Sequence, residues 1–225
     1  KNESNKCLLL QTSWLPEATI EKVSPSNISG VELSMAKLDN LSSQGATEIQ
    51  DKLNPLVDSY KKWINAQNLL TGLDDQQEDT KTKLLDEAYT QAERIQAGIE
   101  LLGNDQVRYA FAITNRVMNK AAQQRFGTMQ GKSPSEINSK WRPFQLAFLL
   151  MNLVGTYEPT NKERETIDLL FFPTGGGKTE AYLGLAAFTL VLRRLKNKGS
   201  IESAGLSVLM RYTLRLLTLD QLGRA

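Results

Sequence analysis

Apolar residues recur at helical spacing through the middle of this chain, from about residue 46 to about residue 126. A repeat of three to four residues places such positions on one side of a helix, where they can face a core. Interruptions near residues 72–75 and 103–105 divide the region into three predicted helices. Their apolar faces would consist of Leu56, Val57, Tyr60, Trp63 and Ile64, then Leu84, Leu85, Ala88, Ala92, Ile95 and Ile99, and then Tyr109, Ile113, Val117 and Met118.

The segments on either side of this region follow different patterns. Residues 1–45 mix short apolar stretches with Ser, Asn and Pro, which predicts an irregular N-terminal segment with one or two strands. Residues 127–140 are polar and contain Gly and Ser, as is typical of a linker, and residues 143–154 return to a strongly apolar helical pattern. We therefore predict three regions: the segment 1–45, a helical domain with its linker at 46–140, and a further domain at 141–225.

The last region alternates between short apolar runs and longer helical patterns. Residues 167–172 are Ile, Leu and Phe apart from Asp168, which is typical of a buried parallel strand, and a long helix is predicted for residues 178–196. A second apolar run at 206–210 predicts another strand, followed by an amphipathic helix at 213–225. This order predicts an α/β fold, in which a helical N-terminal domain precedes the start of a doubly wound parallel sheet.

Residues 173–179, between the first predicted strand and its helix, have the sequence Pro-Thr-Gly-Gly-Gly-Lys-Thr. Glycines at such a turn let backbone N–H groups surround a phosphate at the positive end of a helix. We expect the Lys178 ammonium to contact the β- and γ-phosphates of ATP, and the Thr179 hydroxyl to coordinate Mg²⁺. Lys178 and Thr179 are therefore the catalytic candidates, and Thr179 is also the candidate metal ligand. The predicted nucleotide-binding residues of the loop are Thr174, Gly175, Gly176, Gly177, Lys178 and Thr179.

The loop departs from the general P-loop pattern G-x-x-x-x-G-K-[ST] at one position, where Phe172 replaces the first glycine. Superfamily 2 helicases often have another residue there, so the difference favours that class over kinases and small GTPases. The alternative is a chance cluster of glycines at a turn. An apolar strand pattern before the loop and an amphipathic helix after it are the context that a P-loop requires.

Two flanking segments resemble helicase motifs. Residues 141–145, Trp-Arg-Pro-Phe-Gln, are similar to the R-x-[YF]-Q element upstream of the P-loop in superfamily 2 enzymes. An amide both donates and accepts, which suits the edge of adenine, so Gln145 is the adenine candidate. The alternative is an exposed glutamine at a helix start.

The second flanking segment, residues 208–221, is similar to motif Ia, whose polar groups hold the nucleic-acid backbone. Its guanidinium and hydroxyl groups are donors suited to phosphate contact. The alternative is that the arginines solvate the helix and pair with Asp220. The nucleic-acid candidates are Arg211, Thr213, Arg215 and Thr218.

The dipeptide Asp86-Glu87 imitates the acidic box that holds Mg²⁺ and positions the attacking water. It precedes the P-loop, falls within a helical repeat and lacks the apolar strand that leads into such a box. We therefore reject it and expect the true acidic box beyond residue 225.

Composition removes several classes of function. The single cysteine excludes an internal disulfide, and the absence of histidine excludes a His-based zinc site and a Ser-His-Asp triad. Residues 1–140 carry 16 basic and 18 acidic side chains, and residues 141–225 carry 11 and 7, so the basic excess lies beside the motif. That excess permits a polyanionic partner without showing one. With no run of about 18 apolar residues and a polar start, we expect a cytoplasmic protein with no membrane contact.

Taken together, residues 141–153, 168–194 and 206–225 resemble the helicase subunit of the DISARM anti-phage system. The specific sequences are Phe-Pro-Thr-Gly-Gly-Gly-Lys-Thr-Glu-Ala-Tyr-Leu-Gly at 172–184 and Arg-Tyr-Thr-Leu-Arg-Leu-Leu-Thr at 211–218. With a similar helical stretch before the motor, the resemblance covers about half of the chain. It implies a bacterial, ATP-dependent helicase or DNA translocase whose RecA-like motor domain begins here.

The resemblance also implies a partner subunit and invading DNA, single-stranded or duplex with a single-stranded end, as the substrate. Hydrolysis would need an acidic box and arginine fingers from a second domain, so we expect this chain to be an inactive part of a larger enzyme. Two alternatives stay open. One is a P-loop ATPase switch that regulates assembly of a defence complex without translocation, and the other is an interaction module with a vestigial nucleotide site.

Overall fold

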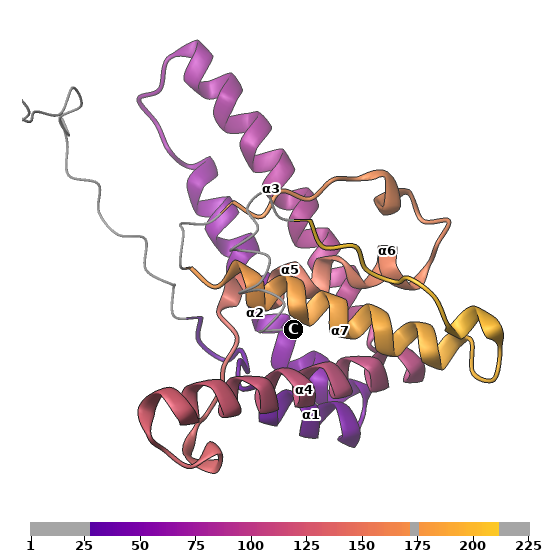
Figure 1. The fold of residues 1–225 in the computed structure, drawn as a ribbon. Coiled ribbons are helices and arrows are strands. Elements are labelled where there is room, and N and C mark those ends of the chain that lie inside the picture. Colours follow the sequence, from indigo (N-terminus) through magenta and orange to yellow (C-terminus); the bar gives the residue numbers. More distant parts are fainter. Residues whose placement is uncertain (1–27, 172–175, 212–225) are drawn as a thin grey trace, which may run out of the picture.

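The computed structural model describes residues 28–171 and 176–211, which are mostly helical (Figure 1). Short 3-10 turns lie at Pro134–Glu136, Lys162–Glu165 and Ile201–Ser203. The α-helices of the described residues are α1 (Met35–Gln44), α2 (Ala46–Asn68), α3 (Asp75–Leu101), α4 (Asp105–Gln130), α5 (Pro143–Met151), α6 (Leu153–Tyr157) and α7 (Lys178–Lys196).

Local capping groups set the limits of the long helices. The Asp74 carboxylate accepts from the Gln77 N–H at 2.8 Å, and the Gln77 amide accepts from the Asp74 N–H, which forms a capping box at the start of α3. The Asn104 side chain caps α4, and Gly131 ends it in the left-handed conformation. The three predicted helices and their two interruptions are therefore confirmed.

The helices share one hydrophobic core. α4 packs between α1 and α7, while α5 packs against α3 and α7 (Figure 1). The largest buried side chains include Phe111 of α4, Leu149 of α5 and Phe188 of α7, and they belong to one cluster. This cluster includes residues on both sides of the predicted boundary at residue 140, and the division into domains stays a prediction.

Residues 1–45 are predicted to form an irregular segment, but helix α1 lies within it. Met35, Leu38 and Leu41 recur every three residues, and the first two are buried against the core. Residues 1–27 lie outside the described residues. In the described part of the chain, none of the helices combines the length and apolar character needed to cross a membrane.

The predicted start of a RecA-like parallel sheet is wrong for the part of the chain that the structure describes. Within the described residues, 28–171 and 176–211, the one β-type pairing is an isolated antiparallel bridge of Ser34 with Lys140. The apolar runs at 167–171 and 206–210 form no ladder. The fold of these residues is helical rather than α/β.

The prediction failed because a parallel strand forms only when neighbouring strands bond to it. An apolar composition shows only that a segment could be buried. In residues 167–171 the N–H of Phe171 bonds locally to the carbonyl of Leu169 at 3.1 Å, which bends the backbone away from a strand. At the second run the Arg193 guanidinium, from α7, donates to the carbonyl oxygen of Leu206 and to that of Ala204, just before the run. A local backbone bond in the first run and a side-chain donor at the start of the second thus occupy groups that a ladder would use.

Replacing Gly98 with Ala is expected to lower the free energy of unfolding by about 1–3 kcal/mol. A Cβ atom added at Gly98 of α3 would overlap the carbonyl oxygen of Leu150 in α5, so the two helices would have to separate. Equilibrium denaturation with urea measures the change. Gly155→Ala is the matched control, because its Cβ would meet Glu163 at an ordinary contact distance of 3.4 Å. Equal stability of both variants would contradict the close approach of α3 and α5.

Candidate nucleotide-binding site

The predicted P-loop ends at the start of helix α7. Gly177 precedes the helix with φ of 86°, in the left-handed region that favours glycine, and Lys178 and Thr179 occupy the first turn. The first N–H groups of a helix have no partner within it and carry partial positive charge, so this terminus can attract an anion. Thr174 and Gly175, two of the predicted phosphate-binding residues, lie outside the described residues.

Two side chains from the start of α5 hold the end of this loop. The Arg142 guanidinium donates to the carbonyl oxygen of Gly176 at 2.7 Å, and the Gln145 amide donates to the carbonyl oxygen of Gly177 at 2.7 Å. Gln145 also accepts from the backbone N–H of Arg142 at 2.7 Å. The R-x-[YF]-Q element and the end of the P-loop, more than 30 residues apart, are thereby in direct contact.

These contacts also orient the N–H groups of the loop. In a trans peptide the C=O and the following N–H point in opposite directions, and the described residues contain no cis peptide. Because the carbonyl groups of Gly176 and Gly177 point to α5, the N–H groups of Gly177 and Lys178 point away from it. The arrangement aims two successive donors to the side of the loop opposite α5, as binding of a phosphate requires.

Gln145 is buried, with 4% of its surface exposed, so the alternative of an exposed glutamine does not describe it. Its amide oxygen and nitrogen both bond within the chain. An amide nitrogen has two hydrogens and an amide oxygen two lone pairs, so each atom retains capacity for one further bond. Its contact with adenine stays a prediction.

Trp141 anchors the R-x-[YF]-Q element in the core. Its indole N–H donates to the Asn115 side chain of α4 at 2.7 Å, and its backbone N–H donates to the carbonyl of Leu33 at 2.8 Å. A Cβ atom added at Gly184 of α7 would lie 2.8 Å from the indole ring, so this glycine permits close packing. One side chain thus fixes α4 and α7 relative to the residues that hold the loop.

A third attachment reaches α7 from α4. The Arg125 guanidinium lies 3.1 Å from the carboxylate of Glu180, in the first turn of α7. Arg125 is partly exposed, and pairs of this kind contribute about 0–1 kcal/mol to stability. The pair therefore orients Glu180 more than it stabilises the fold. Sequence reasoning missed this contact and that of Arg142, although Arg142 stands in the R-x-[YF]-Q signature that identified Gln145.

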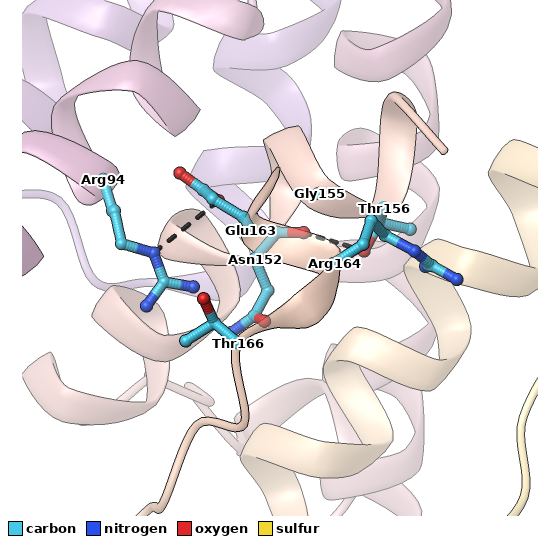
Figure 2. Close-up of a pocket in the computed structure, with 7 residues that line it drawn as sticks. All are labelled: Arg94, Asn152, Gly155, Thr156, Glu163, Arg164 and Thr166. Carbon is cyan, nitrogen blue, oxygen red and sulfur yellow. Dashed lines mark hydrogen bonds and ion pairs between the residues drawn. The ribbon is translucent and has the colours of Figure 1, made fainter. Parts of the chain in front are cut away.

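A partly buried ion pair holds the segment before the loop. Arg94 of α3 donates to both carboxylate oxygens of Asp168, at 2.7 and 2.9 Å. Its Nε also lies 3.6 Å from the carboxylate of Glu163, and Figure 2 shows these two side chains facing each other. The hydrogen bond with Asp168 and the charges of both acids raise the pKa of Arg94 above its usual value, against the opposing effect of burial. Asp168, the polar residue within the predicted strand, is therefore a contact to the helical core.

The predicted nucleic-acid residues lie only in part within the described residues. Arg211 is described and exposed, whereas Thr213, Arg215 and Thr218 lie outside the described residues. Their contact with nucleic acid stays a prediction. The rejected dipeptide Asp86-Glu87 lies on the exposed side of α3, within a helix as its repeat indicated.

No model of a protein family matches the chain. The chain is 38% identical, over an alignment of 242 positions, to the DISARM protein DrmA of Bacillus paralicheniformis (strain ATCC 9945a / NCIMB 11709 / CD-2). The chain is related to a DISARM protein. The alignment includes 98% of this chain and 21% of DrmA, so the chain spans about a fifth of that relative's length. The resemblance to a DISARM protein is confirmed, and the assignment to superfamily 2 helicases stays a prediction.

Proposed function

We propose that this chain contributes the phosphate-binding part of a Mg-ATP site to a protein of the DISARM anti-phage system. The orientation of the loop at the start of α7 carries the proposal. Arg142 and Gln145 hold two successive carbonyl groups, so that the N–H groups of Gly177 and Lys178 are directed away from α5. Similarity to DrmA supports the role in defence.

The residues at this helix start fit a nucleotide phosphate. A Cβ atom at Gly177 would lie 2.6 Å from the Gln145 amide nitrogen, so the close approach of the loop requires a glycine. Lys178 adds a cation and Thr179 a hydroxyl in the first turn, which suits a phosphate and a hard metal ion. Mg-ATP would supply the phosphoryl group to be transferred, while the chain binds and orients it.

The finer proposal is that the full-length protein is a cytoplasmic, ATP-dependent superfamily 2 helicase or translocase that works with a second subunit. Exposed Arg211 and the basic excess of residues 141–225 support contact with a DNA backbone. The second candidate is an ATPase switch without translocation. The switch is supported by contacts from α3, α4 and the start of α5 to the loop or to residues beside it. Such contacts could transmit the binding of a nucleotide to the helical core.

Steady-state ATP hydrolysis by the full-length protein tests these functions. For a motor we expect turnover that rises at least several-fold with single-stranded DNA, or with duplex DNA that has a single-stranded end. Because phosphate contacts release counterions, the stimulation should fall steeply as salt rises. Arg211→Ala should weaken the stimulation and leave basal turnover unchanged. Turnover that ignores DNA would favour the switch, and absence of both turnover and nucleotide binding would contradict the proposal.

A further inference from the structure

We propose that Arg94 and Asp168 are positioning residues that couple nucleotide binding at α7 to helix α3. The proposal rests on the nucleotide-binding function proposed above and adds a path by which the helical core responds to it. Asp168 stands ten positions before Lys178, in the segment that leads into the loop, whereas Arg94 stands near the C-terminal end of α3.

The geometry of the pair is that of a strong, directional attachment. Two parallel N–H donors of Arg94 meet the two oxygens of Asp168, which fixes the angle as well as the distance. Arg94 is 9% exposed, so water competes little for its donors. Gln91, one turn earlier on α3, accepts from the same guanidinium at 2.8 Å and holds it in place.

A second acid completes the surroundings of Arg94. Glu163, in the 3-10 turn before the segment, faces its Nε across a small polar cavity lined also by Asn152, Thr156 and Thr166 (Figure 2). The facing atoms, 3.6 Å apart, have no hydrogen-bond partner within the described residues. Arg94 thus interacts with both ends of the stretch 163–168, and Asp168 is its close partner.

Apolar contacts do little to hold the same segment. Ile167, Leu169 and Phe171 are 95%, 85% and 90% exposed, so alternate side chains point away from the core. Within the described part of the chain, the hydrogen bonds that join residues 167–171 to a helix are the two from Arg94. The position of the segment therefore depends on this ion pair, and a change at Asp168 releases residues 167–171 from α3.

Coupling of this kind is reciprocal. If the pair helps to place the loop for a phosphate, a bound nucleotide must stabilise the contact of α3 with the segment by the same factor. We therefore expect the α3 amides around Arg94 to exchange their hydrogens more slowly when the nucleotide binds. A pair that only stabilises the fold would leave the amides around Arg94 no more protected by the nucleotide than amides of helices away from the pair.

Hydrogen exchange and nucleotide titration of the full-length protein test the proposal, with a fluorescent ATP analogue and Mg²⁺. In the wild type, the nucleotide should slow exchange in residues 90–98. Asp168→Asn keeps the shape of the side chain and removes its charge. We expect it to raise the dissociation constant by about 5- to 30-fold, within the usual range of such couplings, and to abolish the protection of α3.

Two controls separate coupling from stability. Asp79→Asn breaks an exposed ion pair with Lys83 on the same helix and should leave both the affinity and the protection unchanged. Gly199→Ala strains the left-handed turn after α7, with no atom within 4 Å of the added Cβ, so it lowers stability without touching the pair or α3 and should also preserve both. If wild-type protein binds the analogue but shows no protection of α3, or if Asp168→Asn binds as tightly as wild type, the coupling is wrong. Failure of the wild type to bind at all overturns the proposed function as well.

Discussion

Replacing Lys178 with Ala is expected to raise the dissociation constant for Mg-ATP by roughly 30- to 150-fold, equivalent to about 2–3 kcal/mol. The ammonium stands in the first turn of α7, at the positive end of a 19-residue helix, where it would meet the most highly charged part of the ligand. Truncation removes this charge and its hydrogen bonds and leaves the backbone donors in place. Titration of the full-length protein with a fluorescent ATP analogue measures the effect.

A matched control separates this specific effect from loss of positive charge. Lys198 follows the same helix at its other end and is exposed, so Lys198→Ala removes one charge and should change the affinity less than twofold, roughly the scale of a screened surface charge. Thermal unfolding of both variants should match the wild type. An unchanged affinity in Lys178→Ala would place the phosphates elsewhere and refute the site.

The helices could be predicted because their signals are local. A capping aspartate at Asp74, an asparagine at Asn104 and a proline at Pro143 mark helix starts within a few residues of the apolar repeats that they precede. The predicted limits of α7, residues 178–196, agree with the structure for the same reason. Each of these signals acts through bonds that close within one turn.

The prediction of a sheet failed because an apolar run is only part of the signal that a sheet requires. An apolar run such as 206–210 shows that a segment could be buried, but the partner that would bury it lies elsewhere in the chain. In the structure, Leu206 and Leu209 are exposed, and Arg193 donates to the backbone carbonyls of Leu206 and of Ala204 before it. In the other run, 167–171, Asp168 is the one polar residue. The sequence pattern gives no sign that it pairs with the buried Arg94.

The site shows the same division. The placement of Lys178 and Thr179 in the first turn of α7 follows from the order of a short motif, and the structure has both there. The contacts of Arg142, Arg125 and Arg94 with the loop and its neighbours span 34, 55 and 74 positions of sequence. A single sequence contains no signal for such pairs. Three arginines from three helical regions therefore hold the end of the loop or residues on either side of it, in a way that only the fold reveals.

Replacing Gly177 with Ala is expected to weaken nucleotide binding by about 10- to 30-fold, through two separate effects. The left-handed conformation, with φ of 86°, costs alanine about 1–2 kcal/mol. The new Cβ would also lie 2.6 Å from the amide nitrogen of Gln145 and 3.3 Å from the Glu180 carboxylate. Displacement of Gln145 releases the carbonyl of Gly177, and the N–H of Lys178 loses its fixed direction.

Gly199→Ala isolates the first effect, the backbone strain. Gly199 has φ of 78° with no atom within 4 Å of an added Cβ, so it carries the backbone strain without the collision. It should lower stability by a similar amount, about 1–2 kcal/mol, and leave nucleotide affinity unchanged. Gln145→Ala removes the group that Cβ would displace, so adding Gly177→Ala to it should weaken binding less than Gly177→Ala does alone. Additive losses in that double variant would show that the loop binds phosphate without the hold of Gln145.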